Sequence, residues 1–115
     1  MTFSESDRKR IEKIMDEYLK VSRPPIQIRD KLDIGYRIEN QSVEIFEIRP
    51  AFDKPCEIIE TPVAKATYVK RSGIWKIYWM KADLNWHRYE PTPDVDDLES
   101  FLSIIEEDQF GCFFG

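Results

Sequence analysis

The stretch "VAKATYVKRSGIWKIYWMKAD", residues 63–83, decides the fold. Its threonine, valine and aromatic residues favour β-strands, and Ser72-Gly73 suits a tight turn between two runs. A two-residue turn there gives an antiparallel hairpin with two unlike faces. One face carries Tyr68, Trp75, Ile77 and Trp79 and is the natural core face; the other carries Lys65, Thr67, Lys76, Tyr78 and Met80.

Downstream of this hairpin, a turn at residues 84–85 leads into a short last strand over "WHRYE", residues 86–90. With that turn, His87 pairs with Ala82 and lies on the face of Lys65. The strand ends at the following proline. The sequence therefore predicts a further short strand beside the aromatic hairpin.

Upstream, "LDIGYRIENQSVEIFEIRP", residues 32–50, alternates apolar and polar residues around Asn40 and Gln41. This pattern predicts a first hairpin in which Ile38 faces Val43. Residues 50–62 contain three prolines and are predicted to be a long connecting loop.

Helical patterns bracket the strands. In "SDRKRIEKIMDEYLKVSR", residues 6–23, apolar residues recur at helical spacing, with Ser4 or Ser6 as the cap. A second helix is predicted in "TPDVDDLESFLSIIEEDQFG", residues 92–111, with Thr92 as its cap and Pro93 at its first position. The last residues are apolar, and we expect docking against the core from Phe110, Phe113 and Phe114.

These elements predict an α+β fold. An antiparallel sheet of about four to five strands, formed by two hairpins and a short last strand, packs against an N-terminal and a C-terminal helix. Residues 1–115 are expected to form a single compact domain. The helices should cover one sheet face and leave the other to solvent or to a partner.

Composition narrows the class of protein. Hydrophobic residues make up 42% of the 115 residues, but no apolar run approaches the ~18 residues of a membrane span. The N-terminus turns charged at once and does not resemble a secretion signal. We therefore expect a cytoplasmic protein without membrane contact. With one histidine and no paired cysteines we expect no metal site, and the common cofactor motifs are absent from the sequence.

The net charge of −5 is unevenly distributed. Residues 63–89 carry six basic side chains against one aspartate, whereas residues 90–115 carry eight acidic side chains and no basic one. The aromatic hairpin is thus the basic part of an acidic chain.

Exposed aromatic residues beside basic ones can stack bases and contact phosphates. The first hypothesis is therefore a noncatalytic binding module whose sheet face contacts a nucleic acid or an acidic protein surface. A plainer alternative is that the lysines only keep the sheet soluble. The candidate partner-binding residues are Lys65, Lys76, Tyr78, Lys81, Trp86 and Arg88.

Two other functions stay open. A carboxylate, two cations and an imidazole are suited to a hydrolase of the phosphodiesterase or nuclease type, if these side chains converge. That catalytic set is Glu47, Arg49, Lys65 and His87. The third hypothesis is a structural or homodimeric protein that associates through an open sheet edge.

Several segments together resemble the bacterial family called domain of unknown function 3024. They are "RPPIQIRDKLDIGYRIENQSVEIFEIRP", "PVAKATYVK", "WKIYWMKADLNWHRY" and the terminal "GCFFG". The resemblance covers residues 23–115 and implies a small, free-standing cytoplasmic protein. It transfers no catalytic residue.

Overall fold

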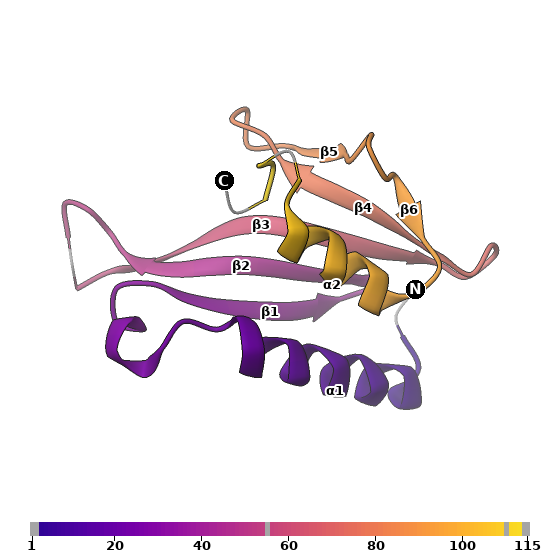
Figure 1. The fold of residues 1–115 in the computed structure, drawn as a ribbon, viewed down its shortest axis with the longest axis horizontal. Helices are drawn as coiled ribbons and strands as arrows, with labels where there is room; N and C mark the ends of the chain where they lie inside the picture. Colours follow the sequence, from indigo (N-terminus) through magenta and orange to yellow (C-terminus); the bar gives the residue numbers. More distant parts are fainter. Residues whose placement is uncertain (1–2, 55, 110, 114–115) are drawn as a thin grey trace.

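The computed structural model describes residues 3–54, 56–109 and 111–113. Figure 1 shows two helices and a twisted antiparallel sheet, so the α+β fold predicted from the sequence is confirmed. Along the chain the elements are α1 (Glu5–Ser22), the short 3-10 helix η1 (Ile26–Ile28), β1 (Asp33–Glu39), β2 (Ser42–Pro50), β3 (Ile58–Val69), β4 (Ile74–Met80), β5 (Trp86–Arg88), β6 (Asp94–Val95) and α2 (Leu98–Glu107).

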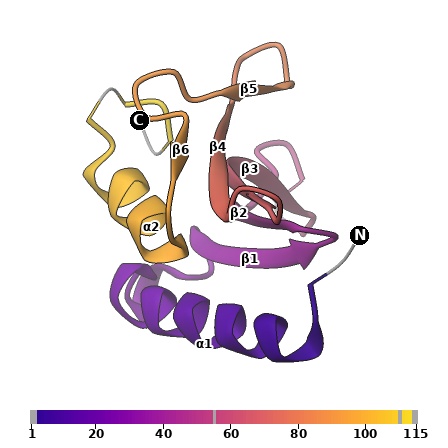
Figure 2. The same ribbon diagram turned by 90° about the vertical axis from the view of Figure 1, so that its right-hand side faces the viewer.

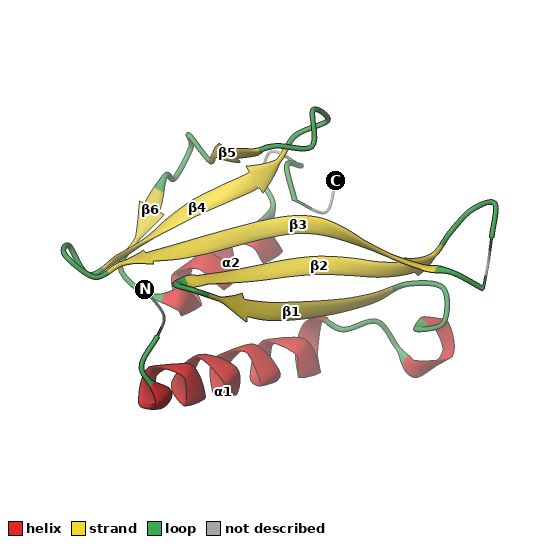
Figure 3. Cartoon of the chain, turned by 180° about the vertical axis from the view of Figure 1, so that it is seen from behind, coloured by secondary structure: helices red, strands yellow, loops and turns green. Residues whose placement is uncertain are grey.

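The strands follow the order β1-β2-β3-β4-β5, and β6 also pairs with β4. In Figure 1 α2 crosses in front of the sheet, and in Figure 3, from behind, the sheet lies in front of α2. Figure 2 shows α1 and α2 as neighbours on that side. The helices therefore cover one face, called here the helix face, and the opposite face is called the open face.

The first hairpin has the predicted register. Ile38 lies opposite Val43, and Glu39 closes the ladder against Ser42. The turn places Asn40 in the left-handed region with φ of 54°, which asparagine tolerates better than most residues. Near the turn β1 and β2 alternate apolar and polar residues, so this register puts Tyr36, Ile38, Val43 and Ile45 on the helix face.

The second hairpin has the predicted faces but a longer turn. Tyr68 pairs with Trp75, and Val69 with Ile74, so residues 70–73 form a four-residue connection. Because the register moves by two residues relative to a two-residue turn, each side chain keeps its face. The core confirms this assignment. Buried residues of the helix face are Val43, Ile45, Ala64, Ala66, Trp75 and Ile77, together with Ile11, Met15, Phe101 and Ile105 from the helices.

The long loop predicted over residues 50–62 is shorter in the structure, because both of its ends are strand. β2 continues to Pro50 and β3 begins at Ile58, which leaves residues 51–57 as the connection. Proline misled the prediction because it cannot donate a ladder hydrogen bond. Here Pro50 ends its strand, and Pro62 lies at an irregularity in the β2–β3 pairing, where that missing donor is tolerated.

The C-terminal helix starts later than predicted. Asp94 and Val95 pair with β4 as β6, and α2 begins at Leu98 with Asp97 as its cap. The carboxylate of Asp97 accepts a hydrogen bond from the Ser100 amide at 2.7 Å. Thr92 is therefore not the cap. Pro93 precedes a strand, where its carbonyl accepts from the Ile77 amide at 3.0 Å.

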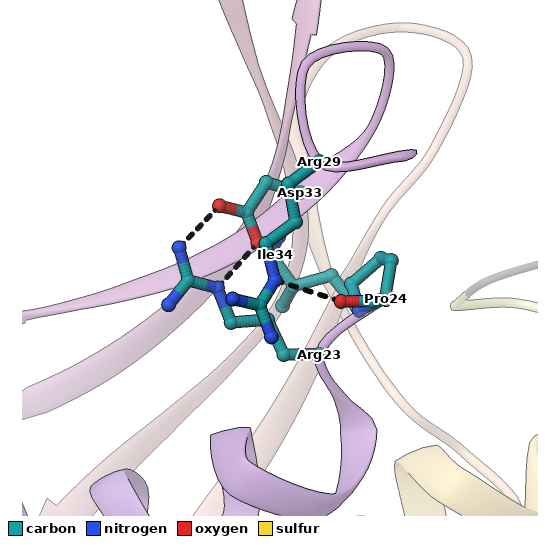
Figure 4. A network of polar contacts seen from close by, with 5 residues as sticks. All are labelled: Arg23, Pro24, Arg29, Asp33 and Ile34. Carbon is teal, nitrogen blue, oxygen red and sulfur yellow. Dashed lines mark hydrogen bonds and ion pairs between the residues drawn. The ribbon is translucent and has the colours of Figure 1, made fainter. Parts of the chain in front are cut away.

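An ion pair ties the end of α1 to β1. The Arg23 guanidinium donates to both carboxylate oxygens of Asp33, at 2.7 and 2.6 Å (Figure 4). Arg29 donates to the Pro24 carbonyl at 2.8 Å in the same network. The hydrogen bond from Arg23 is the main cause that lowers the pKa of Asp33.

The chain end packs against the body of the protein. Phe113 is buried and its ring lies 4.9 Å from that of Tyr89, between centroids, so the expected docking is seen for this residue. Phe110 and Phe114 lie outside the described residues. None of the helices in the described ranges is long and apolar enough to cross a membrane.

Candidate functional site

A row of side chains crosses the open face from β1 to β5. Directly opposed residues in an antiparallel sheet point to the same face. The register therefore gathers a cation, an acid, a cation, an aromatic ring and a cation in one line. In strand order these are Arg37, Glu44, Lys65, Tyr78 and Arg88.

The centre of this row is a cluster of two cations and two aromatic rings. The Lys65 ammonium lies 5.1 Å from the ring centroid of Tyr78 and 4.9 Å from that of Trp86. The Arg88 guanidinium carbon lies 5.9 Å from the Tyr78 centroid. We call these four residues the cation-aromatic cluster. All four are half-buried, so their flat surfaces and charges remain partly accessible.

The cluster has an unusual electrostatic setting. Burial lowers the pKa of Lys65, and the neighbouring Glu44 carboxylate partly offsets this. Arg88 donates to the Pro93 carbonyl at 3.3 Å, and its Nε is shielded from solvent without a hydrogen-bond partner among the described residues. Arg88 also lies 4.0 Å from the Asp94 carboxylate, so Lys65 and the outer N–H groups of Arg88 are the donors that an anionic group could take up.

Of the other predicted partner-binding residues, Lys76 belongs to this face and Lys81 does not. Lys76 lies opposite Thr67 on β3 and Asp94 on β6. The Lys81 ammonium lies 5.2 Å from the ring centroid of Trp79, whose side chain belongs to the helix face. Lys81 comes two residues after Trp79, so the alternation of β4 itself favours the helix face for it, and grouping it with the open-face residues was wrong.

The predicted catalytic set is not brought together. Glu47 and Arg49 form a 2.8 Å ion pair on β2, and they point to the helix face with Ile45. Lys65 points to the open face. His87 pairs with Trp79, so it too belongs to the helix face, three strands from β2. At ~4.8 Å per strand, about 14 Å separates its strand from β2.

The position of His87 corrects the predicted register of the last strand. Residues 81–85 form the connection, with Leu84 in the left-handed region, instead of a two-residue turn. This shifts the pairing by an odd number of residues and exchanges the faces. The His87 ring instead contacts the carboxylate of Asp83, a residue of this connection, at 2.9 Å. In the described ranges, no three His, Cys, Asp or Glu side chains are grouped so as to hold a metal ion.

Residues 3–115 match the model of a domain of unknown function, DUF3024. The chain belongs to this family. No curated protein and no solved structure matches it.

In this DUF3024 chain, sequence reasoning missed the β1 side of the open face. The Arg37 guanidinium lies 4.4 Å from the ring centroid of Phe46 and pairs with Glu60 at 2.6 Å. The apolar-polar alternation did not predict the burial of Phe46, because this residue lies on the face of β2 that carries polar side chains and yet is buried. The alternation itself could have placed Arg37 beside Glu44, since the first hairpin register was predicted.

Proposed function

We propose that the protein is a noncatalytic binding module that takes single-stranded nucleic acid on its open sheet face. The observation that supports this is the cation-aromatic cluster of Lys65, Tyr78, Trp86 and Arg88 on the face that the helices leave uncovered. Aromatic rings stack with bases regardless of sequence, and neighbouring cations contact phosphates. Lys76, on the same face, extends the row of charges.

A nucleic acid suits this face better than an acidic protein surface. An acidic protein surface offers carboxylates, which would pair with the cations and leave the aromatic rings without a role in binding. A nucleotide offers a flat base and a phosphate together, which matches a ring beside a cation. The overall acidity of the chain, with a net charge of −5, favours a local contact over broad electrostatic attraction.

Binding to labelled single-stranded RNA and DNA, measured by fluorescence anisotropy, tests the proposal. If Lys65, Lys76 and Arg88 each neutralise one phosphate, the slope of log K against log salt is about −2, or a hundredfold loss per tenfold increase in salt. Absence of salt-sensitive binding at about 100 µM protein contradicts the proposal. Tighter binding of poly-glutamate than of RNA contradicts its nucleic-acid form.

Variants locate the contact. Lys65→Gln with Arg88→Gln should weaken binding about tenfold or more, since two phosphate contacts are lost. The matched control, Lys13→Gln with Lys20→Gln, removes the same charge from exposed positions of α1. Glu44→Gln should strengthen binding, because it removes the carboxylate between Arg37 and Lys65. Equal losses in the test and control variants would place the contact elsewhere.

A further inference from the structure

A groove runs between α1 and α2 on the side of the protein opposite the open face. It consists of two hollows of about 240 and 370 Å³, which share Ile14 and Glu99 as lining residues. The hollows therefore adjoin. α1 lines them from Asp7 to Ser22, which at 1.5 Å per residue is a length of about 22 Å.

The floor of the groove is apolar. Ile11, Ile14 and Tyr18 come from one stripe of α1, and Leu98 and Leu102 come from α2. At one end Val21 is 86% exposed, although it continues the stripe of α1 at helical spacing. Ile11, Tyr18, Leu98 and Leu102 are buried, so Ile14 and Val21 supply the accessible apolar surface that a partner would cover.

The rim of the groove is acidic. Its only basic residue among the described lining is Arg10, which already lies 3.8 Å from Asp7. The Tyr18 hydroxyl donates to the Glu106 carboxylate at 2.9 Å and so fixes one of the acids at the groove wall. The six carboxylates of the rim are Asp7, Glu17, Asp96, Asp97, Glu99 and Glu106.

We propose that this groove docks a basic amphipathic helix of a partner protein. A helix of about 15 residues matches its length, and leucine-type residues at i, i+3/i+4 and i+7 would fill the apolar floor. Lysine or arginine residues flanking that stripe would meet the acidic rim, which supplies charge complementarity. The inference goes beyond the proposed function, because it uses the helix side of the molecule and a partner of opposite charge.

A synthetic peptide tests the proposal. The probe is a helical peptide of about 16 residues with leucines at helical spacing and lysines beside them, and the comparison peptide has serine in place of every leucine at equal charge. The leucine peptide should bind at least about tenfold more tightly, by anisotropy. Amide chemical-shift changes should lie on α1 and α2. Equal binding of both peptides, or shift changes confined to the open face, would overturn the proposal.

Groove variants sharpen the test. Glu17→Lys with Glu99→Lys should weaken the leucine peptide by about tenfold or more, whereas Glu57→Lys with Glu90→Lys, the same charge change at exposed sites outside the groove, should change it by less than about twofold. Val21→Ser, at an exposed position that the fold tolerates, should weaken the peptide about threefold. A dimer of the protein alone that Glu17→Lys dissociates would show that a second copy occupies the groove and would overturn the proposal.

Discussion

At the scale of single residues, Phe46 shows how a large aromatic ring is buried on a sheet face without a helix. The residue is only 6% exposed. The Arg37 guanidinium covers it, and Glu60 holds that guanidinium from β3. Gly35, on the neighbouring strand, leaves the room into which the ring fits. Burial here comes from a charged side chain lying flat over the ring.

Gly35→Ala should therefore destabilise the protein. An added Cβ would lie 3.0 Å from Cε2 and 3.1 Å from Cζ of Phe46, and 3.3 Å from Cδ1 of Ile48. The ring must shift, and overpacking of this kind costs about 1–3 kcal/mol of unfolding free energy. The lower entropy of the unfolded chain offsets up to about 1 kcal/mol of this. We expect a net loss of about 1 kcal/mol, measured by urea denaturation.

A double-mutant cycle isolates the cause. In the Phe46→Leu background the smaller side chain leaves space, so Gly35→Ala should cost less than about 0.5 kcal/mol there. If Gly35→Ala costs the same in both backgrounds, the contact with the Phe46 ring is not the reason for its effect.

At the scale of elements, local signals placed the start of the last helix five residues too early. "TPD" has a capping threonine, a proline and an acid in the order that opens many helices. Tertiary pairing overrides these signals, because Asp94 and Val95 complete the sheet beside Trp75 and Lys76. Asp97 offers an equally good cap five residues after Thr92. Only the position of β4 decides between the two starts, and a local pattern does not contain it.

Asp97→Ala should lower the unfolding free energy by about 1 kcal/mol, the usual cost of losing a cap. Thr92→Ala, at the cap expected from the sequence, should change it by less than about 0.5 kcal/mol. Urea denaturation at neutral pH measures both. A larger cost at Thr92 would contradict the observed helix start.

The Asp97 carboxylate also makes the unfolding free energy depend on pH, and the sign of this dependence follows from its pKa. Hydrogen bonds from Ser100 lower the pKa of Asp97 in the folded state. Its stabilisation is therefore complete above the unfolded pKa of about 3.9 and is lost as the pH falls through the lower folded value. The difference between the wild-type protein and Asp97→Ala should shrink in that acid range.

The strands show which parts of the site a sequence can predict. Alternation has a period of two, so the faces of Lys65, Lys76 and Tyr78 were predicted even though the turn between β3 and β4 was two residues longer than expected. The length of the connection before β5 was wrong by an odd number, and His87 changed face. A face assignment stays correct when the turn length is wrong by an even number of residues, and it is reversed when the error is an odd number.

At the scale of the whole molecule, the cations of the basic block and the acids of the groove lie on opposite sides of the sheet. The basic block predicted from residues 63–89 supplies Lys65, Lys76 and Arg88 to the open face. The acidic C-terminal segment joins acids of α1 around the groove on the other side. This second grouping was not predictable, because it depends on how α1 and α2 lie next to each other, as Figure 2 shows. The open face also carries the acids Glu39, Glu44, Glu60 and Asp94, so it is mixed in sign, whereas the lining of the groove is acidic.

This separation predicts how the groove acids influence nucleic-acid binding. The shortest extent of the molecule is 25 Å, so the groove acids act on the open face mainly through long-range fields. The Debye length is about 30 Å at 10 mM salt and about 8 Å at 150 mM. Replacing Glu17, Glu99 and Glu106 with glutamine should therefore raise the association rate for single-stranded RNA about twofold at the lower salt concentration and leave it unchanged at the higher one. Stopped-flow fluorescence measures both rates.

Glu44→Gln, on the open face itself, is the matched comparison. It should retain most of its effect on the association rate at 150 mM salt, since the Glu44 carboxylate lies beside the proposed contact. An equal increase at both salt concentrations for the groove variant would show that the acids act through a change in structure instead of through their field.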